Sequence, residues 1–141
     1  MNCNNLLLIK IDPITGLYEG DLGSFVVENN ENIRKFFFDS KEINLFFDVN
    51  KDVEDWEYTA IFDVFPYDKF ENQGFMVFDI EDDYNPAWIV KFEYIENHEK
   101  LQDRIDKLMN LIEESLEYSF NNIMGKSEEY MNYIEEEKKY E

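Results

Sequence analysis

The chain has 141 residues, a length that fits a single domain. Aromatic residues fill 17% of its positions while Gly and Pro fill only eight, and this composition opposes disorder because it offers enough apolar surface to offset the entropy lost on folding. Thirteen Lys and Arg against 33 Asp and Glu give a formal net charge of −20, spread over the whole sequence. Such a charge repels nucleic acid and anionic lipid and attracts basic partners, although acidity that only keeps a protein in solution is an alternative explanation.

The first residues of the chain bear on its compartment. Cys3 is the only cysteine, so no intramolecular disulfide can form, and its place near the terminus predicts an incidental thiol rather than a nucleophile. The apolar run 6–9 is too short for the hydrophobic region of a signal peptide, and no basic residue precedes it. Nothing approaches the ~20 apolar residues of a membrane span. We therefore expect a cytoplasmic protein with no membrane contact.

The next elements are predicted as strands. Residues 6–11 form a compact apolar run. The Pro and Gly within residues 12–16 supply the fixed φ and the positive φ of a turn, so residues 17–28 should return as the second strand of a hairpin. Residues 30–38 fit either a short helix or a strand, because their apolar side chains match both periods.

Four further runs are predicted as strands of the same sheet. Apolar and polar residues alternate over residues 43–49 and 58–64. Residues 75–80 and 87–95 flank the turn-rich segment 81–86, which should close a hairpin. Because short polar loops join consecutive strands, we expect an antiparallel, meander-like sheet of about five to six strands, with one face packed on helices.

Beyond residue 95 the apolar residues recur at helical spacing. Asn97 is a suitable N-cap and Gly125 is suited to the position after the last turn, so a long helix is predicted between them. Its roughly 28 residues would span about 42 Å, longer than a small domain needs, which predicts either a kink or a projection toward a partner. A second, shorter helix is expected over residues 127–140.

These elements define the expected architecture. The fold class is α+β, with the sheet followed by the long C-terminal helix and the shorter second helix. We expect a single acidic domain over residues 1–141, with a sheet region at 1–95 and a helical region at 96–141.

Candidate metal and catalytic residues are few. Residues 48–52 match the opening of a calcium-binding loop, but Val53 and Thr59 stand where that loop needs Gly and a bidentate Glu, so a hairpin turn is the better interpretation. His98, the only histidine, would have to act alone as ring ligand or catalytic base, and its position at a helix start favours a surface role. No Gly-rich phosphate loop is present. We predict no catalytic residue, cofactor or metal; an enzyme that uses carboxylates alone is an alternative, because 33 acids allow many pairs.

Aromatic residues interleaved with acids mark the candidate binding surface. Tyr and Trp are enriched at interface hot spots, although the same rings could instead cover the sheet. The acidic turn at residues 81–83 could hold a hard cation, but a surface turn is the better interpretation in so acidic a chain. The predicted partner-binding residues are Trp56, Glu54, Asp55, Glu57, Glu81, Asp82, Asp83, Tyr130, Tyr133, Glu135, Glu136 and Glu137.

We expect a non-enzymatic interaction protein whose partner is a basic protein surface, with no direct binding to nucleic acid. In its sharper form it is an inhibitor that mimics nucleic acid, since ordered carboxylates can imitate phosphates that supply one charge per ~1.7 Å of duplex axis. In size and composition the chain resembles small acidic inhibitors of bacterial defence nucleases and immunity proteins that neutralise basic toxins. The alternative is a housekeeping domain, acidic only for solubility and able to form a homodimer through its long helix or a sheet edge.

Overall fold

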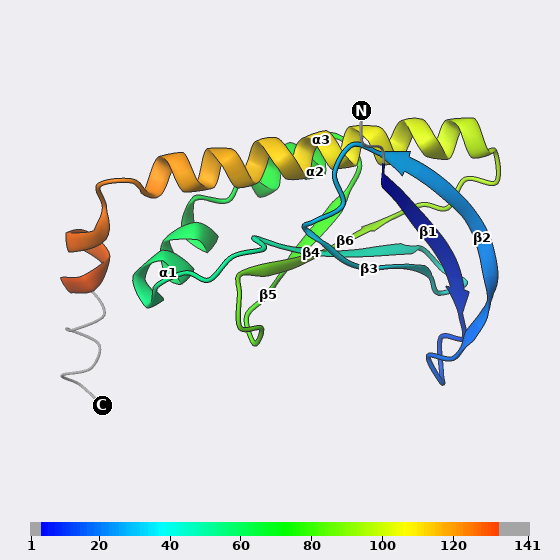
Figure 1. The fold of residues 1–141 in the computed structure, drawn as a ribbon, viewed down its shortest axis with the longest axis horizontal. Helices are drawn as coiled ribbons and strands as arrows, with labels where there is room; N and C mark the ends of the chain where they lie inside the picture. The colour runs from blue at the N-terminus through cyan, green and yellow to red at the C-terminus, as the bar shows by residue number, and fades with distance from the viewer. Residues whose placement is uncertain (1–3, 133–141) are drawn as a thin grey trace.

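A computed structural model describes residues 4–132 of the chain. This part holds a six-stranded sheet and a long helix that lies across one face of it (Figure 1). Two shorter helices are inserted between the fourth and fifth strands. The elements are β1 (Asn4–Ile11), β2 (Tyr18–Val27), β3 (Ile33–Phe38), β4 (Ile43–Asp48), α1 (Asp55–Val64), α2 (Tyr67–Asn72), β5 (Met76–Ile80), β6 (Ala87–Phe92) and α3 (His98–Ile123).

The predicted α+β class is confirmed, and the sheet is mixed. Its strand order is β2-β1-β3-β4-β6-β5, and every neighbouring pair is antiparallel except β1 and β3, which run parallel. The chain thus departs from a meander twice, because β3 pairs with β1 instead of β2, and β6 inserts between β4 and β5. Of the two alternatives for residues 30–38, the structure has the strand, β3.

The core lies between the sheet and α3. Neighbouring residues of β4 and β6 meet in buried pairs on the face that α3 covers, as the alternation along these strands predicts. Each side chain of this kind stabilises the fold by roughly 1.5–3 kcal/mol when it is buried completely. The three pairs are Ile43 with Phe92, Leu45 with Val90 and Phe47 with Trp88.

The predicted strand over residues 58–64 is wrong, because this segment belongs to α1. Its alternation was misleading in so short a run. Trp56, Ala60, Ile61 and Val64 recur at the three- and four-residue steps of a helix, and Ala60 and Ile61 are buried. The helix α2 was not predicted at all. It comes directly after Pro66, which stands at its N-cap and has no N–H to leave unpaired.

The long helix α3 is confirmed at both ends. The Asn97 side chain accepts a hydrogen bond of 3.0 Å from the Lys100 N–H, and Gly125 has a φ of +79°, the left-handed conformation that follows many helices. Figure 1 shows the helix running straight across the sheet and on beside α1. Its apolar stripe is buried from Leu101 to Ile123, so the described chain itself covers the whole length of this helix.

A second helical segment begins at residue 127, as predicted, and is described as far as residue 132. The remainder of the predicted helix over 127–140 lies outside the described residues. Within residues 4–132 no helix combines the length and the apolar character that crossing a membrane requires.

Candidate interaction surface

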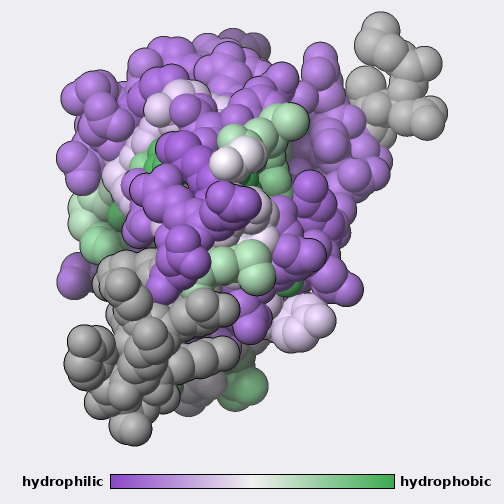
Figure 2. Space-filling view, turned by 90° about the vertical axis from the view of Figure 1, so that its left-hand side faces the viewer, coloured by the Kyte–Doolittle hydropathy of each residue, from purple (hydrophilic) through white to green (hydrophobic). Residues whose placement is uncertain are grey.

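The net charge is distributed unevenly between the two ends of the fold, mainly because most Lys and Arg lie at one end. One end is built from residues 49–86 and 108–132, which include α1, α2, β5 and the second half of α3, and these residues hold 16 Asp and Glu against three Lys. The Arg104 guanidinium from the first half of α3 also reaches this end, where it donates to the carbonyl oxygens of Gln73 and Gly74. We call it the acidic end. Residues 4–48 and 87–107, called the sheet end, hold 13 acids and eight Lys and Arg. Figure 2 views the molecule from the acidic end and shows a mainly hydrophilic surface with small apolar patches.

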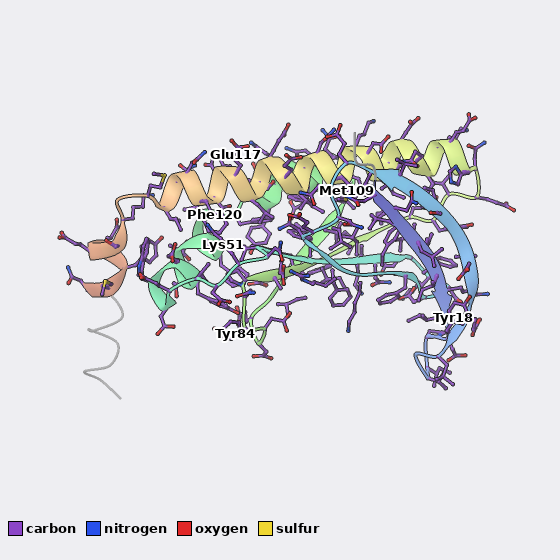
Figure 3. All side chains as sticks on the ribbon, in the orientation of Figure 1. Tyr18, Lys51, Tyr84, Met109, Glu117 and Phe120 are labelled. Atoms are coloured by element: carbon purple, nitrogen blue, oxygen red, sulfur yellow. The ribbon has the colours of Figure 1, made fainter. Side chains whose placement is uncertain are left out.

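Within the described residues, the carboxylates of the acidic end have no ion-pair partner. The Lys51 ammonium lies 3.8 Å from the centre of the Phe120 ring (Figure 3), and the Lys69 ammonium lies 5.2 Å from the Tyr118 ring. Both lysines are therefore held by cation–π attraction rather than by acids. The ion pairs of the described chain all lie at the sheet end and join Lys10 to Glu19, Arg34 to Asp48 and Lys91 to Glu42.

The start of α1 fixes part of the predicted surface. The Glu54 N–H donates to the Glu57 carboxylate at 3.0 Å, the return bond of a capping box, and the Trp56 indole N–H donates to Glu54 Oε2 at 2.6 Å. The Trp56 ring is half-buried against the core. Glu54 and Glu57 thus have a local structural role as well as a charge, whereas Asp55 is exposed and engages no side chain of the described protein.

Tyr58 joins α1 to the acidic turn at residues 81–83. Its hydroxyl lies 2.8 Å from the carbonyl oxygens of both Glu81 and Asp83, and its single proton can be donated to either. The structure therefore brings two separate parts of the predicted set, residues 54–57 and 81–83, to the same end of the molecule.

Tyr130 lies in a cavity between α1 and the helical segment after α3. The cavity has a volume of about 330 Å³ and is lined by Thr59, Asp63, Glu129 and Tyr130. The Tyr130 ring is half-buried against the core. Burial raises the pKa of Tyr130 to about 12, and the negative charge of the nearby Asp63 carboxylate adds to the effect. Two carboxylates beside two hydroxyls make this cavity suited to a cationic group such as an ammonium or guanidinium.

The pKa values of two further tyrosines are raised in part by the negative charges of this end. Burial raises the pKa of Tyr58, and the charges of the acidic turn and of Asp79 add to the effect. Burial also raises the pKa of Tyr67. A hydrogen bond from Trp88 acts in the opposite direction, and the charges of Asp79 and other acids raise this pKa further. A phenolate is disfavoured where carboxylates already repel negative charge.

A family model matches residues 1–131. The chain belongs to DUF6762, a family of unknown function. No curated protein and no solved structure matches it. The DUF6762 match includes the whole described part of the acidic end except residue 132.

Four predicted residues of this DUF6762 chain belong to the C-terminal segment that follows residue 132. Tyr133, Glu135, Glu136 and Glu137 lie outside the described residues, as does Cys3. Two acids outside the predicted set, Asp63 and Asp79, lie near predicted residues. On a helix, Thr59 and Asp63 are four residues apart and share one face, as they do in α1. The predicted strand over residues 58–64 did not indicate this grouping.

Asp48 of the calcium-like segment and the single histidine, His98, both have structural roles. The Asp48 carboxylate, first in the calcium-like segment, accepts two hydrogen bonds of 2.8 Å from the Arg34 guanidinium. The His98 ring stacks on Phe25 at 4.6 Å between centroids, and its Nε2 lies 2.9 Å from the Ser24 carbonyl oxygen. Among residues 4–132 no group of three or more His, Cys, Asp and Glu side chains converges as a metal site would require.

Proposed function

We propose that the acidic end binds a basic surface of a partner protein, and that its carboxylates occupy the place that nucleic-acid phosphates would take on that surface. The single observation that carries this proposal is the separation of charge, because 16 acids share one end with three lysines and the Arg104 guanidinium, and none of those acids is in an ion pair within the described chain. Unpaired carboxylates keep their full attraction for an incoming cationic group.

Order in the backbone supports the proposal. A mimic of phosphates gains from a rigid arrangement, since ordering flexible side chains on binding lowers the affinity. The cap at Glu54 and the Tyr58 bonds to the acidic turn hold the backbone that carries these acids. An inhibitor of a basic, nucleic-acid-binding protein is the form of interaction that suits this arrangement.

The test compares neutralised variants of the two ends. One variant carries Asp55→Asn, Asp82→Asn, Asp83→Asn and Glu129→Gln, and its control carries four matched changes at the sheet end, Glu31→Gln, Glu93→Gln, Glu96→Gln and Asp103→Asn. The probe is a poly-lysine of defined length, and binding is measured by titration calorimetry at several salt concentrations.

The acidic-end variant should bind at least about tenfold more weakly than the parent, because each exposed pair contributes roughly 0.2–1 kcal/mol. The control should lose less than about threefold, and the parent affinity should fall steeply with salt. Equal losses in both variants would show that only total charge matters, as expected of a domain that is acidic for solubility alone. For mimicry, duplex DNA and the parent protein should compete for one basic DNA-binding protein; simultaneous binding of both would exclude it.

A further inference from the structure

The two edge strands of the sheet differ, and α3 covers the β2 edge at Ser24 and Val26. The Gln102 side chain on α3 accepts a hydrogen bond of 3.1 Å from the Val26 N–H and donates one of 2.9 Å to the Val26 carbonyl oxygen. One helical turn earlier, His98 bonds to the Ser24 carbonyl oxygen. Two side chains of α3 thus take the place that another strand would occupy, which is how native proteins protect an edge.

The β5 edge is open. This strand pairs with β6 on one side. On the other side, no group among residues 4–132 hydrogen-bonds to the backbone of residues 76–80. Met76 and Phe78 are 52% and 44% exposed although both are apolar. Unpaired N–H and C=O groups beside exposed apolar side chains form a template for an added strand.

The register of the sheet shows what an added strand would meet. Phe78 lies opposite Ile89, which lies opposite Phe46, so an apolar row crosses the outer face of the sheet and reaches the β5 edge. Asp79 points to the opposite face, because successive side chains of a strand alternate, and it is exposed. Residues 76–86 contain four acids and no Lys or Arg. The β5 edge is therefore apolar on the outer face of the sheet and acidic on the opposite face. It is also acidic beyond the C-terminal end of the strand, at residues 81–83.

We propose that the β5 edge binds an extended basic segment of the partner by strand addition, with apolar side chains of the segment beside Phe78 and Lys or Arg side chains beside Asp79. This inference rests on the proposed function and names its mode of recognition. Main-chain hydrogen bonds give such a complex its affinity, and the alternation of apolar and basic residues gives its specificity.

A second copy of the chain fits this edge less well than a basic segment does. In an antiparallel pairing centred on Phe78, the two Asp79 carboxylates fall on the same face at diagonal positions about 8 Å apart by strand geometry. In a parallel, in-register pairing they face each other directly. Either arrangement brings like charges together, whereas Lys or Arg at the same position would neutralise them.

The experiment uses the parent protein and a synthetic seven-residue peptide that alternates Lys with Val and has blocked ends. Two control peptides keep the same side chains and charge but carry N-methyl groups on alternate backbone nitrogens. One is methylated at the Lys nitrogens and the other at the Val nitrogens. A strand bonds its neighbour through alternate residues, so strand addition predicts that one phase binds at least about tenfold more weakly than the unmethylated peptide while the other still binds. Amide chemical-shift changes should centre on residues 76–80.

Variants of the protein supply the matching control. Asp79→Asn should weaken binding of the unmethylated peptide by about two- to fivefold, as expected for one exposed charge pair, while Asp103→Asn on α3 should leave it unchanged. If both methylated peptides bind as tightly as the parent peptide and the four-acid variant of the acidic end still weakens binding, strand addition is wrong and the charge-based function survives. Concentration-dependent shifts at residues 76–80 without peptide would instead identify a second copy as the occupant and overturn the proposal.

Discussion

The sheet end and the acidic end of this molecule differ in how many of their charges form ion pairs and in whether side chains cover the edge strand. At the sheet end, three ion pairs neutralise part of the charge, and Gln102 of α3 covers the β2 edge at Val26. At the acidic end, the acids have no ion pairs within the described chain, Lys51 and Lys69 lie on aromatic rings instead of on acids, and the β5 edge has no partner among residues 4–132. The sheet end thus pairs some of its charges within the chain, whereas the acidic end has carboxylates and a strand edge with no partner among residues 4–132.

Trp88 gives the largest test of this contrast, because it anchors the helices of the acidic end to the sheet. Its indole is completely buried, and its ring centroid lies 4.3 Å from that of Phe65, 5.1 Å from that of Phe47 and 5.2 Å from that of Phe62. Trp88→Ala should lower the free energy of unfolding by about 3–5 kcal/mol, since a large cavity replaces these contacts. Urea unfolding measures the loss, and hydrogen exchange should show faster opening of α1 and α2 than of β1.

A matched change separates packing from hydrogen bonding at this position. The Trp88 indole N–H donates to the Tyr67 hydroxyl at 3.2 Å. Trp88→Phe keeps an aromatic ring and loses this bond, so it should cost less than the change to Ala. A loss below about 1.5 kcal/mol for Trp88→Ala would mean that the acidic end is not attached through this side chain.

The comparison also shows how far the sequence could lead. The period of two along β4 and β6 and the helical stripe of α3 follow directly from the residues, because long or regular patterns leave one solution. Residues 58–64 misled because a run of seven residues satisfies both periods, and the short α2 lacks a stripe of its own.

The candidate site was harder to see in the sequence than the fold. Residues 1–60, 61–95 and 96–141 carry net charges of −7, −6 and −7, so the excess is even along the chain. The separation between the ends arises only when the fold brings the segment 49–86 beside the second half of α3. Trp56, Tyr130 and the acids around them could be named as candidates, but their neighbours Asp63 and Asp79 depend on contacts distant in sequence.

Gln102→Leu tests the covered β2 edge and should have a smaller effect. It removes both hydrogen bonds to Val26, a loss of about 1–2 kcal/mol in the free energy of unfolding because water can replace part of the bonding at this exposed site. Light scattering should also show more self-association than in the parent, because a second edge is now open. Asp106→Ala is the control; it removes the third hydrogen bond of the Gln102 amide, donated to the Asp106 carboxylate at 2.8 Å, and should leave self-association as in the parent because both bonds to Val26 remain. Unchanged stability and association would mean that the β2 edge needs no cover.

The smallest expected effect concerns pH and reports the field of the acidic end. Tyr130 has a pKa of about 12 in the folded protein, against 10.0 for an unperturbed tyrosine. Between these values the unfolded chain has lost the phenol proton that the folded chain keeps, so the unfolded state binds fewer protons and stability falls as the pH rises. The contribution of Tyr130 is therefore intact below pH 10 and is lost progressively from pH 10 to about 12. Absorbance at 295 nm should show a late ionisation that Tyr130→Phe removes, and the variant should lose less stability over the same range. Ionisation of Tyr130 near pH 10 would show that Asp63 and burial do not act on this ring as the contacts around the cavity indicate, and the cavity would then be a weaker place for a partner's cation.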